Sequence, residues 1–149
     1  MKTKITKLLA VSALAASSLV PPALAEEGKV KVGLILSLSG PGSVLGQEMQ
    51  KGADLALEML DGKLGGKEAE FIYEDDQRKP DGGKEAAEKL TRSDDVDVVI
   101  GSSFSNVMMA IHRPITRAGK IVLSPNPAPA PLAGDKCDPN YFAVPFQND

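Results

Sequence analysis

The feature that most constrains the fold is the alternation of apolar, strand-like runs with helical patterns from residue 30 onward. The first run, residues 30–38, is nearly continuously apolar, as expected of a strand buried on both faces of a parallel sheet. Further strand-like runs are expected at residues 69–74, 96–100, 121–123 and 141–144. Helical spacing of apolar residues begins near Gln47, Pro80 and Ser105. This order predicts an α/β fold, an open doubly wound parallel sheet with right-handed crossovers.

The amino terminus has the pattern of a cleaved export signal. Three lysines, Lys2, Lys4 and Lys7, precede a short apolar run, and Ala23-Leu24-Ala25 has the small-x-small form of a signal-peptidase site. We therefore expect residues 1–25 to be a signal peptide and residues 26–149 to form one small domain. No later segment has the roughly 20 apolar residues of a membrane span. We expect an exported chain in the periplasm, without direct membrane insertion after cleavage.

The charge of the chain argues against a nucleic-acid partner. Removing the signal peptide takes away three lysines, so the formal net charge changes from −3 to −6, whereas nucleic-acid binders are typically basic. Short acidic clusters such as residues 74–76 and 94–95 are expected to be solvated strand ends. The single Cys137 is either a free thiol or lacks its partner.

A serine-rich turn is the strongest candidate for a binding site. Gly101-Ser102-Ser103-Phe104-Ser105-Asn106 follows the third predicted strand and opens a helix. The first N–H groups of a helix lack intrahelical partners and favour a carboxylate or phosphate, although Ser and Asn also cap ordinary helices. Two other loops, residues 37–46 and 124–131, leave strand carboxyl ends. Because ligands bind at that edge of such sheets, the three loops together predict one ligand-binding rim.

Catalytic and cofactor alternatives have weaker support. The glycines Gly40, Gly42 and Gly46 superficially match a dinucleotide-binding turn, which would make the chain a nucleotide-dependent oxidoreductase. Pro41 stiffens that turn, however, and an exported protein has no obvious supply of the cofactor. The only histidine, His112, lies in mid-helix without a second His or Cys to complete a metal set. We expect no enzyme activity, no metal and no cofactor.

The order of short motifs resembles a known family. The motifs are Val32-Gly33-Leu34-Ile35-Leu36-Ser37-Leu38-Ser39-Gly40-Pro41, Gly46, Gly65-Gly66-Lys67, Glu74-Asp75-Asp76-Gln77, Val98-Val99-Ile100-Gly101, Ser105, Leu123-Ser124-Pro125 and Phe146-Gln147-Asn148-Asp149. Together they are similar to the amino-terminal half of periplasmic substrate-binding proteins of the leucine/isoleucine/valine type, the type I fold. Those proteins serve ATP-binding-cassette (ABC) importers and close two lobes around a small ligand.

The resemblance implies roles for individual residues. Ser105 matches the position that binds the ligand carboxylate through hydroxyl and backbone N–H. Asn126 and Ala128 fall where backbone groups contact the same carboxylate, but Ala128 lacks the hydroxyl that is common there. Leu45 stands where relatives often place an aromatic ring, and Phe104 is a candidate to compensate. Ser103 of the same turn completes the set of expected ligand residues.

The resemblance also implies the biological setting. It predicts a solute-binding component that captures a branched-chain or other hydrophobic amino acid, or an aromatic acid, and delivers it to a membrane permease. The departures at Leu45 and Ala128 count against a leucine-type ligand. The runs at residues 104–110 and 124–127 resemble the branch of the family associated with aromatic or other hydrophobic carboxylates. A periplasmic sensory module is the alternative. Because relatives place further ligand contacts on a second lobe, we expect residues 26–149 to be a partial amino-terminal lobe, from a fragment or a truncated reading frame.

Overall fold

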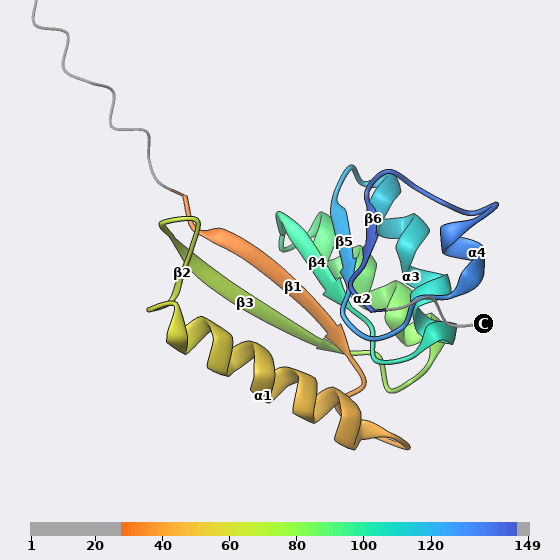
Figure 1. The fold of residues 1–149 in the computed structure, drawn as a ribbon, viewed down its shortest axis with the longest axis horizontal. Helices are drawn as coiled ribbons and strands as arrows, with labels where there is room; N and C mark the ends of the chain where they lie inside the picture. Colours follow the sequence, from red (N-terminus) through yellow and green to blue (C-terminus); the bar gives the residue numbers. More distant parts are fainter. Residues whose placement is uncertain (1–27, 146–149) are drawn as a thin grey trace, which may run out of the picture.

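The computed structural model describes residues 28–145, which form a six-stranded sheet flanked by helices (Figure 1). The sheet order is β2-β3-β1-β4-β5-β6, and every pair is parallel except β2 with β3. The strands are β1 (Val30–Leu36), β2 (Lys63–Leu64), β3 (Lys67–Asp75), β4 (Val98–Gly101), β5 (Ile121–Ser124) and β6 (Tyr141–Ala143). The helices are α1 (Ser43–Met59), α2 (Pro80–Arg92), α3 (Ser105–Arg117) and α4 (Ala130–Ala133).

The doubly wound α/β prediction is confirmed by the positions of the helices. Helix α1 covers one face of the sheet over β1 and β3, whereas α2 and α3 cover the opposite face (Figure 1). The larger core cluster lies between α2, α3 and the sheet, and it includes Ile35, Leu90 and Ile111, which are fully buried. The α1 side has a smaller cluster around Leu34 and Leu36.

Two short elements were not predicted from the sequence. In the sequence, Asp61-Gly62 and Gly65-Gly66 together indicate the stop of the first helix. In the structure, however, Gly65 and Gly66, with φ values of 58° and 84°, form the turn of the β2–β3 hairpin. Gly-Gly suits the two-residue hairpin turns that require positive φ. The helix stop at Gly62 is confirmed, because Gly62 has φ 71° and donates its N–H to Leu57 O at 2.9 Å. The four-residue helix α4 lies in the proline-rich segment that was expected to be a loop.

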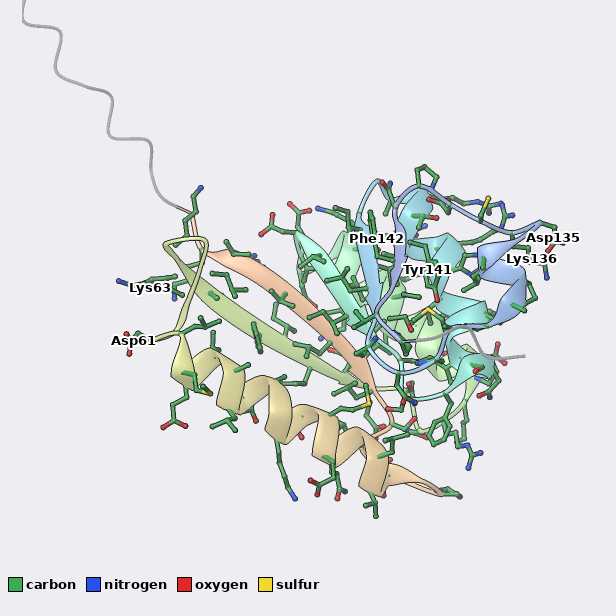
Figure 2. The ribbon with its side chains drawn as sticks, in the orientation of Figure 1. Asp61, Lys63, Asp135, Lys136, Tyr141 and Phe142 are labelled. Atoms are coloured by element: carbon green, nitrogen blue, oxygen red, sulfur yellow. The ribbon has the colours of Figure 1, made fainter. Side chains whose placement is uncertain are left out.

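Charged side chains occupy the extremities of the molecule (Figure 2). Asp61 lies in the turn after α1 and Lys63 begins β2, whereas Asp135 and Lys136 lie at the tip of the loop after α4. None of the helices in residues 28–145 is long and apolar enough to cross a bilayer. The expected signal peptide, residues 1–25, lies outside the described residues.

One apolar surface of the sheet lies beside α1 and has no helix over it. Alternate residues of β4, β5 and β6 point to this side, and register pairs Val98 with Ile121 and Leu123 with Phe142. Ile121 and Phe142 are 42% and 49% exposed. Nearby, Leu34, Leu36, Met49, Ala53, Ile100 and Pro125 line an apolar hollow of about 260 Å³. We call the surface formed by Val98, Ile100, Ile121, Leu123 and Phe142 the open face.

We expect a polypeptide of residues 26–149 to self-associate through the open face, because contiguous apolar surface drives association in water. Sedimentation velocity over a range of concentrations measures this directly. Replacing Ile121 and Phe142 together by lysine should restore the monomer, since both side chains are substantially exposed. A monomer at every concentration, with a cooperative melting transition, would contradict the prediction.

Candidate functional site

Three loops meet where the strand order reverses direction. The chain runs from β1 to β3 on one side and then crosses to β4 on the other, so β1 and β4 flank the reversal point. Ligands of open α/β sheets bind in the crevice outside the strand carboxyl ends at such a point. The loops after β1 and β4 lie there, and the loop after β5 is adjacent.

The start of α3 presents hydrogen-bond donors at this point. Ser105 is the first residue of the helix, and the first recorded intrahelical bond runs from Met108 N to Phe104 O at 3.0 Å. The N–H groups of residues 105–107 therefore precede the regular helical pattern. Among residues 28–145, no side chain caps this helix and no partner is recorded for the Ser105 hydroxyl. Such donors, together with the helix dipole, favour a bound anion.

The other two serines of the turn are structural in this conformation. Ser102 and Ser103 are fully buried. The Ser102 hydroxyl donates to Phe104 O at 2.8 Å, and Phe104 N donates back to it at 3.3 Å. Ser103 Oγ accepts the N–H of Ser37 at 3.1 Å. The turn is thereby fixed against both the loop after β1 and its own backbone, with Ser105 at its outer end.

The loop after β5 is held by hydrogen bonds to its carbonyl groups. The Ser124 hydroxyl donates to Pro127 O, and the Tyr141 hydroxyl approaches the same oxygen at 3.5 Å. Burial raises the pKa of Tyr141 above its usual range, so this hydroxyl stays protonated as a donor. Asn126 Nδ2 donates to Ser103 O at 2.9 Å and ties this loop to the serine turn.

The structure distributes the six predicted ligand residues over the rim. Ser105 and Phe104 are half-buried at the start of α3, and Asn126 is exposed on the neighbouring loop. Leu45 is 36% exposed near the start of α1, while Ser103 and Ala128 lie inside. The three predicted loops therefore converge. Among residues 28–145, no partner is given for the Ser105 hydroxyl, and the N–H groups next to it precede the helical hydrogen bonds.

Sequence reasoning missed Arg78 as a member of this rim. Its guanidinium carbon lies 4.1 Å from the centre of the Phe104 ring, within the range of a cation–π contact. A Cβ added at Gly42, which has φ 83°, would lie 2.8 Å from Phe104 and 3.5 Å from the Arg78 guanidinium. The three residues are therefore closely packed. No sequence motif signals this contact, because Arg78 lies in a loop that only the fold brings beside α3.

Asp76 was also missed, and the expectation that the acidic cluster is solvated is wrong for it. Asp76 is fully buried, and its Oδ1 accepts the Ser37 hydroxyl at 2.5 Å and the Arg78 N–H at 2.7 Å. Burial raises the pKa of Asp76, and the nearby charge of Asp75 acts in the same direction, while the hydrogen bonds from Ser37 and Arg78 oppose the shift.

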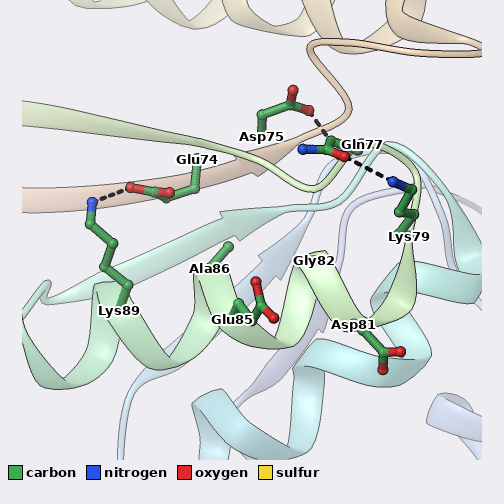
Figure 3. A pocket seen from close by; sticks show the side chains of 9 residues that line it. All are labelled: Glu74, Asp75, Gln77, Lys79, Asp81, Gly82, Glu85, Ala86 and Lys89. Carbon is green, nitrogen blue, oxygen red and sulfur yellow. Dashed lines mark hydrogen bonds and ion pairs between the residues drawn. The ribbon is translucent and has the colours of Figure 1, made fainter.

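A second hollow lies beside β3 and α2 (Figure 3). It measures about 450 Å³, and three of its four acidic side chains, Glu74, Asp75 and Asp81, have partners. Lys89 pairs with Glu74, and Asp75 accepts the N–H groups of Leu38 and Gln77, each at 2.9 Å. In residues 28–145 there is no group of three or more His, Cys, Asp or Glu side chains placed to hold a metal ion.

Comparison with known proteins places this architecture in a family. A family model described as "Periplasmic binding protein" matches residues 29–149. A curated relative, Leu/Ile/Val-binding protein homolog 3 of Brucella melitensis, is 29% identical over 122 residues, which cover 80% of this chain and 32% of that protein. This chain thus spans about a third of the length of that relative.

Two solved structures are similar in both sequence and fold. One is an ABC-transporter solute-binding protein from R. palustris in complex with benzoate, with 34% identity and a TM-score of 0.76 over 80% of this chain and 33% of that one. The other is the branched-chain amino acid transporter substrate-binding protein LivJ from Streptococcus pneumoniae in complex with isoleucine. It has 26% identity and a TM-score of 0.75 over 80% of this chain and 34% of that one. The resemblance found in the sequence is thereby confirmed.

Proposed function

We propose that this chain, which belongs to the periplasmic binding protein family, provides the carboxylate-binding lobe of a solute-binding protein for an ABC importer. The observation that carries the proposal is the start of α3, where Ser105 and adjacent N–H groups lie at the strand-order reversal without recorded partners among the described residues. The relatives are ABC-transporter solute-binding proteins, whose role is to bind small molecules. The proposed partners are a small carboxylate ligand and a membrane permease, and the proposed location is the periplasm.

The favoured ligand is an aromatic carboxylate. The relative that is 34% identical holds benzoate, whereas the relative that holds isoleucine is 26% identical. At the rim, Ala128 is buried and has no hydroxyl to offer a carboxylate. Phe104 places an aromatic ring one residue before Ser105, where it can contribute to the wall of an apolar pocket.

Calorimetric titration of the protein expressed from its complete reading frame tests this choice. We expect benzoate to bind at least about tenfold more tightly than isoleucine, a difference of roughly 1.4 kcal/mol. Benzamide, which keeps the ring but lacks the negative charge, is the matched control and should bind weakly. Tighter binding of isoleucine would contradict the proposal of an aromatic ligand but would still agree with a carboxylate site. Binding of benzamide as tight as that of benzoate would contradict the carboxylate site.

A further inference from the structure

Asp76 carries an unexplained energetic cost. Its side chain is fully buried, and within residues 28–145 its Oδ2 has no hydrogen-bond partner. Burying a carboxylate oxygen without a partner costs free energy, and native proteins contain few such groups. Positions that break the ordinary packing rules are often tied to function. Asp76 does not reach the surface, so any such function must act through its neighbours.

The first connection from Asp76 leads to the serine turn through the loop after β1. Asp76 Oδ1 accepts the Ser37 hydroxyl at 2.5 Å, and the Ser37 N–H donates to Ser103 Oγ at 3.1 Å. Asp76, Ser37 and Ser103 are all fully buried, so water does not compete for these bonds. This connection ends two residues before Ser105.

The second connection leads to the same turn through Arg78. Asp76 Oδ1 also accepts the Arg78 N–H at 2.7 Å, which fixes Arg78 in a left-handed conformation with φ 58°. In that conformation the Arg78 guanidinium lies 4.1 Å from the centre of the Phe104 ring. Phe104 is the residue before α3 begins, so this connection ends next to Ser105.

We propose that Asp76 is the positioning residue of the carboxylate site at the start of α3, acting through Ser37 and Ser103 on one side and through Arg78 and Phe104 on the other. This inference rests on the proposed function. A binding site gains affinity when its donors are held in place before the ligand arrives. A single buried oxygen that accepts two hydrogen bonds holds both sides of the turn at once.

The negative charge of Asp76 has opposite effects on stability and binding. Hydrogen bonds to an ionised acceptor are roughly twice as strong as neutral ones, so the charge strengthens both connections. Its burial disfavours the ionised form and raises the pKa above 3.8. The folded state then holds the proton more strongly than the unfolded state. The stabilising contribution is therefore present below pH 3.8 and is lost as the pH rises through the folded-state pKa.

The variant Asp76→Asn separates a positioning role from a structural one. It retains an acceptor oxygen for Ser37 and Arg78 but removes the buried charge. At neutral pH we expect a higher melting temperature together with about fivefold weaker benzoate binding, because two charge-assisted bonds become neutral. A purely structural residue would change both quantities in the same direction. The measurements are thermal melting and calorimetric titration of the protein from its complete reading frame.

Two companion variants sharpen the test. Asp97→Asn is the matched control, because the Asp97 carboxylate accepts the Lys31 N–H at 2.8 Å at the opposite end of the sheet. We expect it to leave benzoate affinity unchanged. In a Ser105→Ala background, Asp76→Asn should lower affinity less than it does in the parent, since part of its effect passes through the Ser105 hydroxyl. Additive losses in the double variant would overturn the inference.

Hydrogen exchange gives a readout that does not depend on the ligand. We expect Asp76→Asn to speed exchange of the Ser37 and Phe104 amides, which donate to the Ser103 and Ser102 hydroxyls of the turn, about fivefold, as the turn opens more often. If the Asp76→Asn variant binds benzoate with unchanged affinity and its amide exchange is unchanged, the positioning role is overturned and the proposed function still holds. Faster exchange in a protein that binds no carboxylate would support the positioning role and overturn the proposed function.

If Asp76→Asn fails to fold, a second variant tests one connection alone. Arg78 is exposed, and Arg78→Gln removes only its contact with Phe104, so affinity should fall about threefold.

Discussion

Replacing Ser105 by alanine weakens binding of the carboxylate ligand by about 1.5–3 kcal/mol, the usual contribution of a hydrogen bond to a charged group. This corresponds to roughly ten- to a hundredfold in dissociation constant. The expectation follows from the position of the hydroxyl at the first residue of α3, where no partner for it is recorded among the described residues. The backbone N–H groups remain in the variant, so binding is reduced rather than abolished. Calorimetric titration of the protein from its complete reading frame measures the change.

Ser102→Ala provides the matched control, because it makes the same substitution in the same turn. The Ser102 hydroxyl points inward and bonds to the backbone of Phe104 at 2.8 Å. Its loss should lower thermal stability more than it lowers affinity. If both variants weaken binding equally, the serine turn only starts the helix and the carboxylate binds elsewhere.

The parallel sheet could be predicted because each strand is short, apolar and followed by a helical pattern. The sequence of Val30 to Leu36 is typical of a doubly buried strand, and five of its seven residues, 32–36, are buried in the structure. Four of these five pair with strands on both sides. Helix α1 begins four residues before its first predicted residue, Gln47, since Ser43 to Gly46 carries no clear periodic signal. The β2–β3 hairpin was missed because its glycine pair also fits a helix stop.

The candidate site could be predicted only in part. Ser105 follows from a local rule, because a serine at the start of a helix after a strand faces the ligand edge. Asp76 and Arg78 depend on contacts between segments that are 25 or more residues apart, such as Asp76 with Ser37 and Arg78 with Phe104. The sequence shows Asp76 only as one of three consecutive acidic residues. Its burial results from the register of β3 against β1, which pairs Asp75 with Leu36.

Gly46→Ala should destabilise the protein more than any other single methyl group added to α1. A Cβ at Gly46 would lie 2.1 Å from the Ser37 carbonyl oxygen and 2.6 Å from its carbon, so the helix backbone touches the end of β1 directly. Neither backbone segment can rotate away as a side chain can. Forcing an atom into such a contact costs about 3 kcal/mol or more, which lowers the melting temperature by roughly 10 °C.

Gly52→Ala tests whether this effect comes from the contact or from the helix itself. Gly52 lies in the same helix, and an added Cβ would meet nothing within 4 Å. Alanine favours helix over glycine by about 0.8–1 kcal/mol, so this variant should melt at a higher temperature than the parent. The melting temperature should therefore fall for Gly46→Ala and rise for Gly52→Ala, because only Gly46 contacts the backbone of Ser37. Because Ser37 also connects Asp76 to Ser103, Gly46→Ala should weaken ligand binding as well. A rise in melting temperature for both variants would show that α1 does not contact the end of β1.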